Sequence, residues 1–285
     1  MNNNMCMVCS GTTRKYFEKN QGPFGVAEYY QCDECGFIYT GHIESTSYHT
    51  VNEFYSTCDF DIEDSGYKSR AETAFNALSK LLHKHKLEPG KIKLLDYGCG
   101  EGTFLRICRE NDIDAYGYDP FYKNEMDNTL EDMMLENNKK QFDVVTAFEV
   151  VEHSCSMNIF HDIMTFCKPN GLFMFSTGIF NPLIHNNDWE YFSPAHCSFH
   201  TTKSLAVIAE KLHCERIELM RNPFERIPYL LTGEIWRNSK SDDCKLPSID
   251  HVNMLDSIFD KLASVFPKRF YKLLAKLVYS NQYIK

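Results

Sequence analysis

The chain has 285 residues, of which 43% are apolar and 24% are charged, as is typical of a folded globular protein. This length accommodates one large domain and a small appendage. The net charge of −9 makes a nucleic-acid partner unfavourable, because nucleic-acid binders usually present a basic face to the phosphates. No stretch of about 18 uncharged apolar residues predicts a membrane span, and the N-terminus lacks the features of a secretory signal. We therefore expect a cytoplasmic protein.

Two C-x-x-C pairs, Cys6 with Cys9 and Cys32 with Cys35, are separated by 22 residues. Two thiolates at this spacing can chelate one ion from a tight turn, and two such turns complete a tetrahedral four-cysteine zinc site. Since four cysteines leave no coordination position open for water, we expect a structural Zn²⁺ in a ribbon at residues 1–45. The alternative is that one pair is redox-active or that both pairs are incidental.

Strand and helix patterns alternate along residues 66–237, which predicts an α/β domain with a doubly wound, mostly parallel sheet. The polar and aromatic residues 46–65 before it are expected to form a linker or lid, or a loop that packs on the main domain. Helices are expected at 67–86, 103–110, 157–167 and 202–212, strands at 92–96, 115–119, 142–148, 172–176 and 216–220, and a turn at 168–171.

Residues 238–285 are expected to form a C-terminal helical extension after a polar break. The last 20 residues contain five basic residues, no acid and an apolar stripe at helical spacing. Such a helix can lie on an anionic membrane surface, but it can equally pack on its own domain or on a second subunit of an oligomer.

The most informative segment reads LLDYGCGEGTF and begins at Leu94. Its glycines, Gly98 and Gly100 among them, form a turn between a strand and a helix, where the backbone can approach a nucleotide-type ligand closely. Asp96 before the turn favours a ligand with a cationic amino acid portion over a pyrophosphate. Asp119 ends the next strand, 21 residues after Gly98, where an acid can accept both ribose hydroxyls.

Together with FEVVEH from Phe148, KPNGL from Lys168 and the later stretch from Trp189 to Phe199, this segment resembles the class I methyltransferases that use S-adenosylmethionine. The resemblance covers about residues 67–221 and implies a Rossmann-like fold with S-adenosylmethionine as donor and S-adenosylhomocysteine as product. It implies cofactor contacts from Asp96, Tyr97, Gly98, Cys99, Gly100, Asp119, Pro120, Phe148 and Glu149. The alternative is a nicotinamide dehydrogenase, whose G-x-G-x-x-G motif would place a glycine where this chain has Thr103.

Methyl transfer to a hydroxyl group gains from a general base, and imidazole titrates in the useful range. We expect the candidate catalytic residues His196, His153 and Tyr191 at the acceptor, with Glu152 in support. His153 has a structural alternative, as a helix cap or a contact to the cofactor, and His200 is a weaker candidate that is expected to face away.

The resemblance is to a bacterial subgroup that methylates sugars and other small metabolites, some of whose members carry an N-terminal zinc ribbon. It implies a small-molecule acceptor, such as a sugar or a precursor in polysaccharide biosynthesis, with O-methylation favoured over N- or C-methylation. Two alternatives remain open: an RNA base methyltransferase that uses the ribbon for recognition, and a non-catalytic scaffold that retains the fold.

Overall fold

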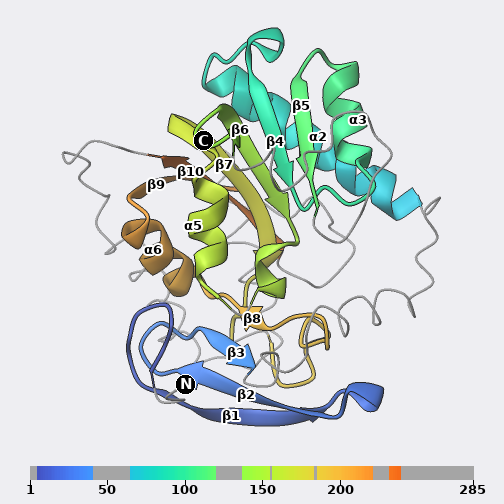
Figure 1. Cartoon of the computed structure of the whole chain (residues 1–285). Coiled ribbons are helices and arrows are strands. Elements are labelled where there is room, and N and C mark those ends of the chain that lie inside the picture. The colour runs from blue at the N-terminus through green and yellow to red at the C-terminus, as the bar shows by residue number, and fades with distance from the viewer. Residues whose placement is uncertain are drawn as a thin grey trace, which may run out of the picture.

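The computed structural model describes residues 5–40, 65–119, 137–154, 156–182, 185–220 and 231–238. They form a six-stranded sheet with helices and a smaller four-stranded sheet near the N-terminus (Figure 1). The expected linker or lid at 46–65 and the expected extension at 238–285 lie, apart from Ser65 and Asn238, outside the described residues, as does Pro120.

The large sheet has the strand order β5-β4-β6-β7-β10-β9. Its strands are β4 (Lys93–Tyr97), β5 (Asp114–Tyr118), β6 (Phe142–Phe148), β7 (Cys167–Gly178), β9 (Cys214–Met220) and β10 (Leu231–Asn238). Neighbours among β4, β5, β6 and β7 pair in parallel, whereas β10 is antiparallel to both β7 and β9. The predicted doubly wound, mostly parallel fold is confirmed, with an antiparallel edge that includes a strand, β10, that the sequence pattern did not predict.

Helices cover both faces of this sheet: α2 (Ser65–Lys84) and α3 (Thr103–Glu110) one face, and α5 (Asn158–Met164) and α6 (Thr202–Lys211) the other (Figure 1). Alternate residues of a strand point to opposite faces. Leu94 therefore packs in the core with Leu81 and Phe104, whereas Leu95 belongs to the core of Ile163 and Leu205. Among the described helices, none is long and apolar enough to cross a membrane.

The expected turn at 168–171 lies inside β7 instead. Phe142 pairs with Cys167 but Val144 pairs with Leu172, so β7 takes up extra residues against β6 in a bulge. Asn170 has a φ of 64°, which fits such an irregularity. The helix expected at 157–167 is correspondingly shorter and ends at Met164, before this strand begins.

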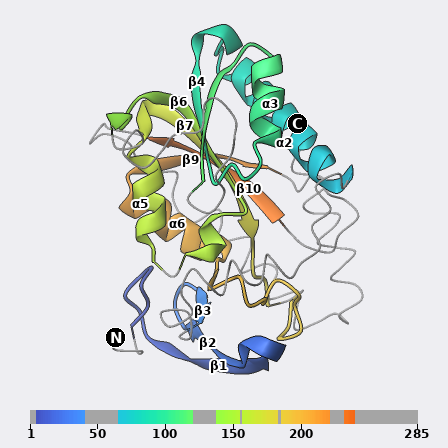
Figure 2. The same cartoon turned by 45° about the vertical axis from the view of Figure 1, so that its right-hand side comes forward.

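The small sheet joins the N-terminal ribbon to the main domain. Its order is β1 (Thr13–Asn20), β2 (Val26–Cys32), β3 (Ile38–Thr40) and β8 (Ser198–Phe199), all antiparallel (Figure 1), and η1 (Gly22–Phe24) connects β1 to β2. Figure 2 shows β1, β2 and β3 below the large sheet. The last strand of the ribbon, β3, thus pairs with β8, a strand that belongs to the main domain. The sheet therefore spans the boundary expected at residue 45.

An aromatic core fills this junction. The Phe17 ring stacks on Tyr29 with 4.4 Å between centroids, and the Phe192 ring lies 5.0 Å from Tyr29 and 4.6 Å from Phe199. Thr201, which caps α6 by accepting a hydrogen bond from the Ser204 backbone, also donates its hydroxyl to the Cys35 carbonyl at 2.6 Å. The ribbon therefore supports the loop between β7 and β8.

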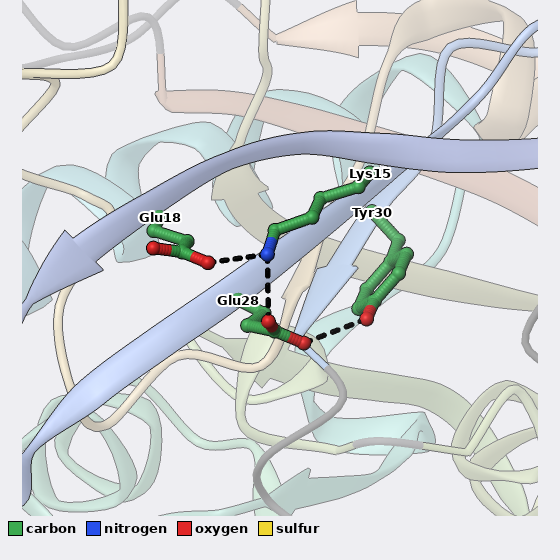
Figure 3. A network of polar contacts seen from close by, with 4 residues as sticks. All are labelled: Lys15, Glu18, Glu28 and Tyr30. Atoms are coloured by element: carbon green, nitrogen blue, oxygen red, sulfur yellow. Dashed lines mark hydrogen bonds and ion pairs between the residues drawn. The ribbon is translucent and has the colours of Figure 1, made fainter.

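The outer face of the ribbon carries a polar network instead (Figure 3). Lys15 Nζ pairs with Glu18 and lies 2.7 Å from Glu28 Oε1, and the Tyr30 hydroxyl donates to Glu28 Oε2 at 2.7 Å. About half of the Lys15 and Glu28 side-chain surface is exposed, so water screens these pairs. Exposed pairs of this kind contribute little to stability, which leaves the aromatic core as the main support of the ribbon.

Candidate functional site

The glycine turn lies between the carboxyl ends of β4 and β5. The Gly98 backbone N–H donates to the Tyr118 carbonyl at 2.6 Å, and the Gly100 N–H donates to Asp119 Oδ2 at 2.9 Å. Gly98 has a φ of 79°, and a Cβ there would lie 2.4 Å from Val150 Cγ2. Both the backbone conformation and the close approach therefore require glycine at this position.

Asp96, the second-last residue of β4, has a buried carboxyl group. The Thr146 hydroxyl donates to Asp96 Oδ1 at 2.6 Å. Burial raises the pKa of Asp96 to about 7, with a further contribution from the charge of Asp119, although the Thr146 hydrogen bond opposes the shift. In the part of the chain that the structure describes, no lysine or arginine forms an ion pair with Asp96. A cationic ligand group would stabilise this carboxylate.

Glu149, directly after β6, has a left-handed backbone with a φ of 55°. A non-glycine residue in this region costs on the order of 1–3 kcal/mol, and such strain concentrates at functional sites. Two hydrogen bonds with β7 hold Glu149 in this conformation. The Glu149 N–H donates to the Ser176 carbonyl at 3.1 Å, and the Ser176 hydroxyl donates to Glu149 Oε1 at 2.7 Å. The strained residue thus points its carboxyl group toward the end of β7.

Two carboxyl groups share the hydroxyl of Tyr191. Its oxygen lies 3.1 Å from Glu149 Oε2 and 2.6 Å from Glu152 Oε1, and it accepts a hydrogen bond from the Gly178 N–H at 2.8 Å. Thr177 donates to the other Glu152 oxygen at 3.1 Å. Burial, followed by the charge of Glu152, raises the pKa of Glu149 to about 8, and burial also raises the pKa of Glu152. Burial beside these acids holds the Tyr191 pKa well above its usual value.

His153 and His196 complete the group. His153 Nδ1 lies 2.8 Å from the Ala195 carbonyl oxygen, His196 Nδ1 lies 2.8 Å from the Tyr191 carbonyl oxygen, and the ring centroids are 4.8 Å apart. Burial, with His153 nearby, lowers the pKa of His196 to about 3, and burial also lowers the pKa of His153. Both rings are therefore neutral at pH 7.

The structure brings the three candidate catalytic residues, His153, His196 and Tyr191, into one cluster with Glu149. Glu152, expected only in support, is its centre. Ser176, Thr177 and Gly178 were missed, although they end a parallel strand, which is where ligands bind in such sheets.

The other expected cofactor residues surround the glycine turn. The Tyr97 ring packs 5.0 Å from that of Tyr118, and the Phe148 ring meets that of Phe104 edge-on at 5.2 Å. Cys99 is buried. His200, by contrast, lies in the core, where its ring is 5.2 Å from that of Phe37 in the ribbon.

The four ribbon cysteines converge on one point. Sγ atoms are 3.7 Å apart between Cys6 and Cys35 and 3.4 Å apart between Cys9 and Cys32, and all four lie within 4.8 Å of one another. A tetrahedral site with Zn–S bonds of about 2.3 Å requires sulfurs about 3.8 Å apart. Backbone N–H groups donate to these sulfurs, for example from Gly11 to Cys9 at 3.4 Å. The cluster therefore has the donor set and the spacing that a structural zinc ion requires.

The chain is similar to several solved structures, and the first of them shares the fold of the main domain. The 1,6-didemethyltoxoflavin N1-methyltransferase of Burkholderia thailandensis is 15% identical with a TM-score of 0.51, and the match covers 79% of this chain and 99% of that one. The magnesium protoporphyrin IX methyltransferase of Synechocystis PCC 6803 is 12% identical with a TM-score of 0.45, covering 70% and 97%. A methyltransferase from Archaeoglobus fulgidus is 18% identical with a TM-score of 0.38, covering 57% and 93%.

No curated protein matches the chain. The family model described as the methyltransferase domain, however, matches residues 68–219, which is more than half of the chain and includes the glycine turn, both acids and the cluster around Glu152. The chain therefore belongs to the methyltransferase-domain family and has the class I fold of the S-adenosylmethionine-dependent methyltransferases.

Proposed function

We propose that this S-adenosylmethionine-dependent methyltransferase methylates a hydroxyl group of a small molecule, such as a sugar or a surface-glycan precursor. The observation that carries the proposal is the pair of acids, Asp96 and Asp119, on either side of the glycine turn at the ends of adjacent parallel strands. The sugar class rests on the family resemblance. A small acceptor also agrees with the similar Burkholderia enzyme, whose crystal structure contains 1,6-didemethyltoxoflavin and S-adenosylhomocysteine.

On the donor side, S-adenosylmethionine supplies an activated methyl group on a sulfonium, together with its leaving group. Asp96 would hold the cationic amino group, which would stabilise its buried carboxylate. Asp119 would accept the ribose hydroxyls, and Gly98 and Gly100 would let the backbone approach the nucleoside closely. The chain's task is to bind and orient the donor, because the reactive bond comes with it.

On the acceptor side, the cluster of Glu149, Glu152, His153, Tyr191 and His196 would bind and orient the hydroxyl group. The neutral imidazoles each have one ring nitrogen with a lone pair, which can receive a hydrogen bond from a hydroxyl. Because burial lowers the pKa of His196 to about 3, orientation suits this residue better than removal of a proton.

We infer that the ribbon holds Zn²⁺ through Cys6, Cys9, Cys32 and Cys35 and acts on the acceptor side through packing. β3 pairs with β8, and β8 follows His196 by one residue. A reducing cytoplasmic compartment would keep the four thiols available to the metal. The zinc site would thus position the acceptor loop rather than take part in the reaction.

Calorimetry of the full chain with S-adenosylmethionine tests the donor assignment. Asp119→Ala removes the ribose acceptor and should weaken binding strongly, whereas Glu110→Ala, at an exposed position at the end of α3, should bind as the wild type does. Absence of binding to the folded wild-type chain would refute the proposal. Incubation with hydroxylated sugars, followed by mass spectrometry for the added methyl group, then tests the acceptor class.

A further inference from the structure

We propose that Glu152, His153 and His196 form a second metal site, for a divalent first-row transition metal ion, beside the donor pocket. Each of the three offers one ligand atom, and these atoms lie within 4.8 Å of one another. Two imidazoles with one carboxylate form a recurrent donor set for such ions, with coordination positions left open for a substrate.

The hydrogen bonds of the two histidines fit this role. A carbonyl oxygen only accepts, so the ring nitrogens that face Ala195 and Tyr191, Nδ1 of His153 and of His196, must carry the hydrogen. In a neutral His196 ring this makes Nε2 the nitrogen with the lone pair, and a second backbone contact, to Glu149, helps to fix the His153 ring. Metal-binding histidines are typically fixed in this way, since the hydrogen bond from the other nitrogen sets both the tautomer and the ring orientation.

The buried carboxylate of Glu152 also requires compensation. Glu152 is fully buried and Glu149 is partly buried, and the two carboxyl groups share the single hydroxyl proton of Tyr191. Within the described segments, neither carboxyl group has an ion pair with a lysine or arginine. Buried carboxyl groups are tolerated when they are protonated, paired or bound to a metal. A divalent cation between Glu152 and the two histidines would compensate the Glu152 carboxylate.

Hydrogen bonds connect the two backbone segments that carry the three ligands. Val151–His153 form a 3-10 turn, η3, after the strained Glu149. The Cys197 N–H donates to the Glu152 carbonyl at 2.9 Å, and the Ser198 hydroxyl donates to the Val151 carbonyl at 3.1 Å. These contacts tie the loop that carries His196 to the turn that carries the other two ligands. The geometry is therefore preorganised, as a metal site requires.

The site adjoins the donor pocket, because Val150 contacts the glycine turn at Gly98 and the charge of Asp119 acts on His153. Resting on the proposed function, this placement suggests that the ion takes the hydroxyl oxygen of the acceptor as a ligand. Coordination would lower the pKa of the hydroxyl, so its proton would leave to water. The oxygen would then form the bond to the methyl carbon while the C–S bond breaks and sulfur keeps the electron pair, giving S-adenosylhomocysteine.

Manganese binding tests the site separately from the ribbon, because thiolates select softer ions than Mn²⁺. Electron paramagnetic resonance titration of the full chain should show about one tightly bound Mn²⁺. Glu152→Gln and His196→Gln, which preserve size and polarity, should weaken Mn²⁺ binding by roughly tenfold or more, since even outer-shell changes have that effect. His161→Gln changes a histidine of α5 that is 69% exposed and should leave binding unchanged.

The proposal is overturned if wild-type protein binds no more Mn²⁺ than the Glu152→Gln/His196→Gln double variant, or if either single variant binds it like the wild type. Circular dichroism on the same samples identifies a variant that fails to fold, and the wild-type titration decides the question in that case. S-adenosylmethionine binding is measured in parallel. Donor binding without Mn²⁺ binding refutes the metal site alone, whereas Mn²⁺ binding without donor binding refutes the proposed function.

Discussion

The proposed donor side and the proposed acceptor side of this site are built in opposite ways. The donor side, from Asp96 through the glycine turn to Asp119, occupies one short stretch of chain on two adjacent strands. The acceptor side brings together η3, the end of β7, the loop before β8 and, through β3, the N-terminal ribbon. A site built from one short stretch of chain should tolerate substitutions in other parts of the protein. A site built from several distant segments should depend on the contacts that hold those segments together.

Loss of the proposed zinc ion should therefore separate the two sides most clearly. Cys35→Ser removes a thiolate from a site whose binding energy, about 10–16 kcal/mol for comparable zinc peptides, supports a ribbon with a small core. We expect zinc loss and a fall in turnover of about 100-fold, because misplacement of catalytic groups by about 1 Å has that effect. S-adenosylmethionine affinity should stay close to that of the wild type.

Metal analysis, calorimetry and turnover on one preparation measure all three quantities. Met7→Ser, at an exposed position between Cys6 and Cys9, is the matched control and should retain the zinc ion. A Cys35→Ser protein that keeps full turnover after losing its zinc would show that the ribbon does not support the acceptor side.

Gly98→Ala should have the opposite effect and weaken donor binding without affecting the ribbon. The new Cβ would meet Val150 Cγ2 at 2.4 Å in a left-handed backbone, and the strain and the clash together cost on the order of 2–4 kcal/mol. We expect S-adenosylmethionine to bind roughly 100-fold more weakly while the zinc content stays unchanged.

Gly22→Ala gives the control, because Gly22 also has a positive φ, of 64°, but has no atom within 4 Å of its Cβ position. This variant should lose a little stability without losing donor affinity. Equal donor affinities for wild type and Gly98→Ala, measured by calorimetry, would contradict the assignment of the glycine turn to the donor.

The same contrast explains what the sequence could predict. Asp96, Gly98 and Asp119 lie at or just after the ends of strands whose apolar residues are adjacent in the chain, so local pattern and spacing predict where these residues lie in the fold. The pairing of Ile38 with Phe199 joins residues that are far apart in the chain, and no local pattern encodes it. The bulge of β7 was likewise read as a turn, because proline and glycine at 169 and 171 favour both structures.

A smaller effect should appear in the pH dependence of the donor side. The pKa of Asp96 is about 7 in the folded protein, above its ordinary value of 3.8. The protonated form cannot pair with a cationic amino group, so S-adenosylmethionine affinity should fall as the pH is lowered from 8 to 6. The stability of the ligand-free protein should change in the opposite direction. The folded state binds this proton more tightly than the unfolded state, so the contribution is lost as the pH rises through 7.

Calorimetry and thermal unfolding between pH 5 and pH 8 measure the two trends. Asp96→Asn, which has no titrating group, should flatten both of them and should bind the donor weakly at every pH. A wild-type affinity that is constant across this range would assign the amino group of the donor to another residue.

The smallest expected effect distinguishes two histidines that lie four residues apart in the chain. His196 belongs to the acceptor cluster, whereas the ring nitrogens of His200 have no hydrogen-bond partner among the described residues and are fully buried near Phe37 and Phe160. An unpaired buried polar group costs about 1–3 kcal/mol. His200→Leu, of similar volume, should therefore raise the free energy of unfolding by about 1 kcal/mol and leave donor and Mn²⁺ binding unchanged. Denaturant unfolding measures this change, and a clear loss of stability would mean that the His200 ring has a polar partner in the folded protein.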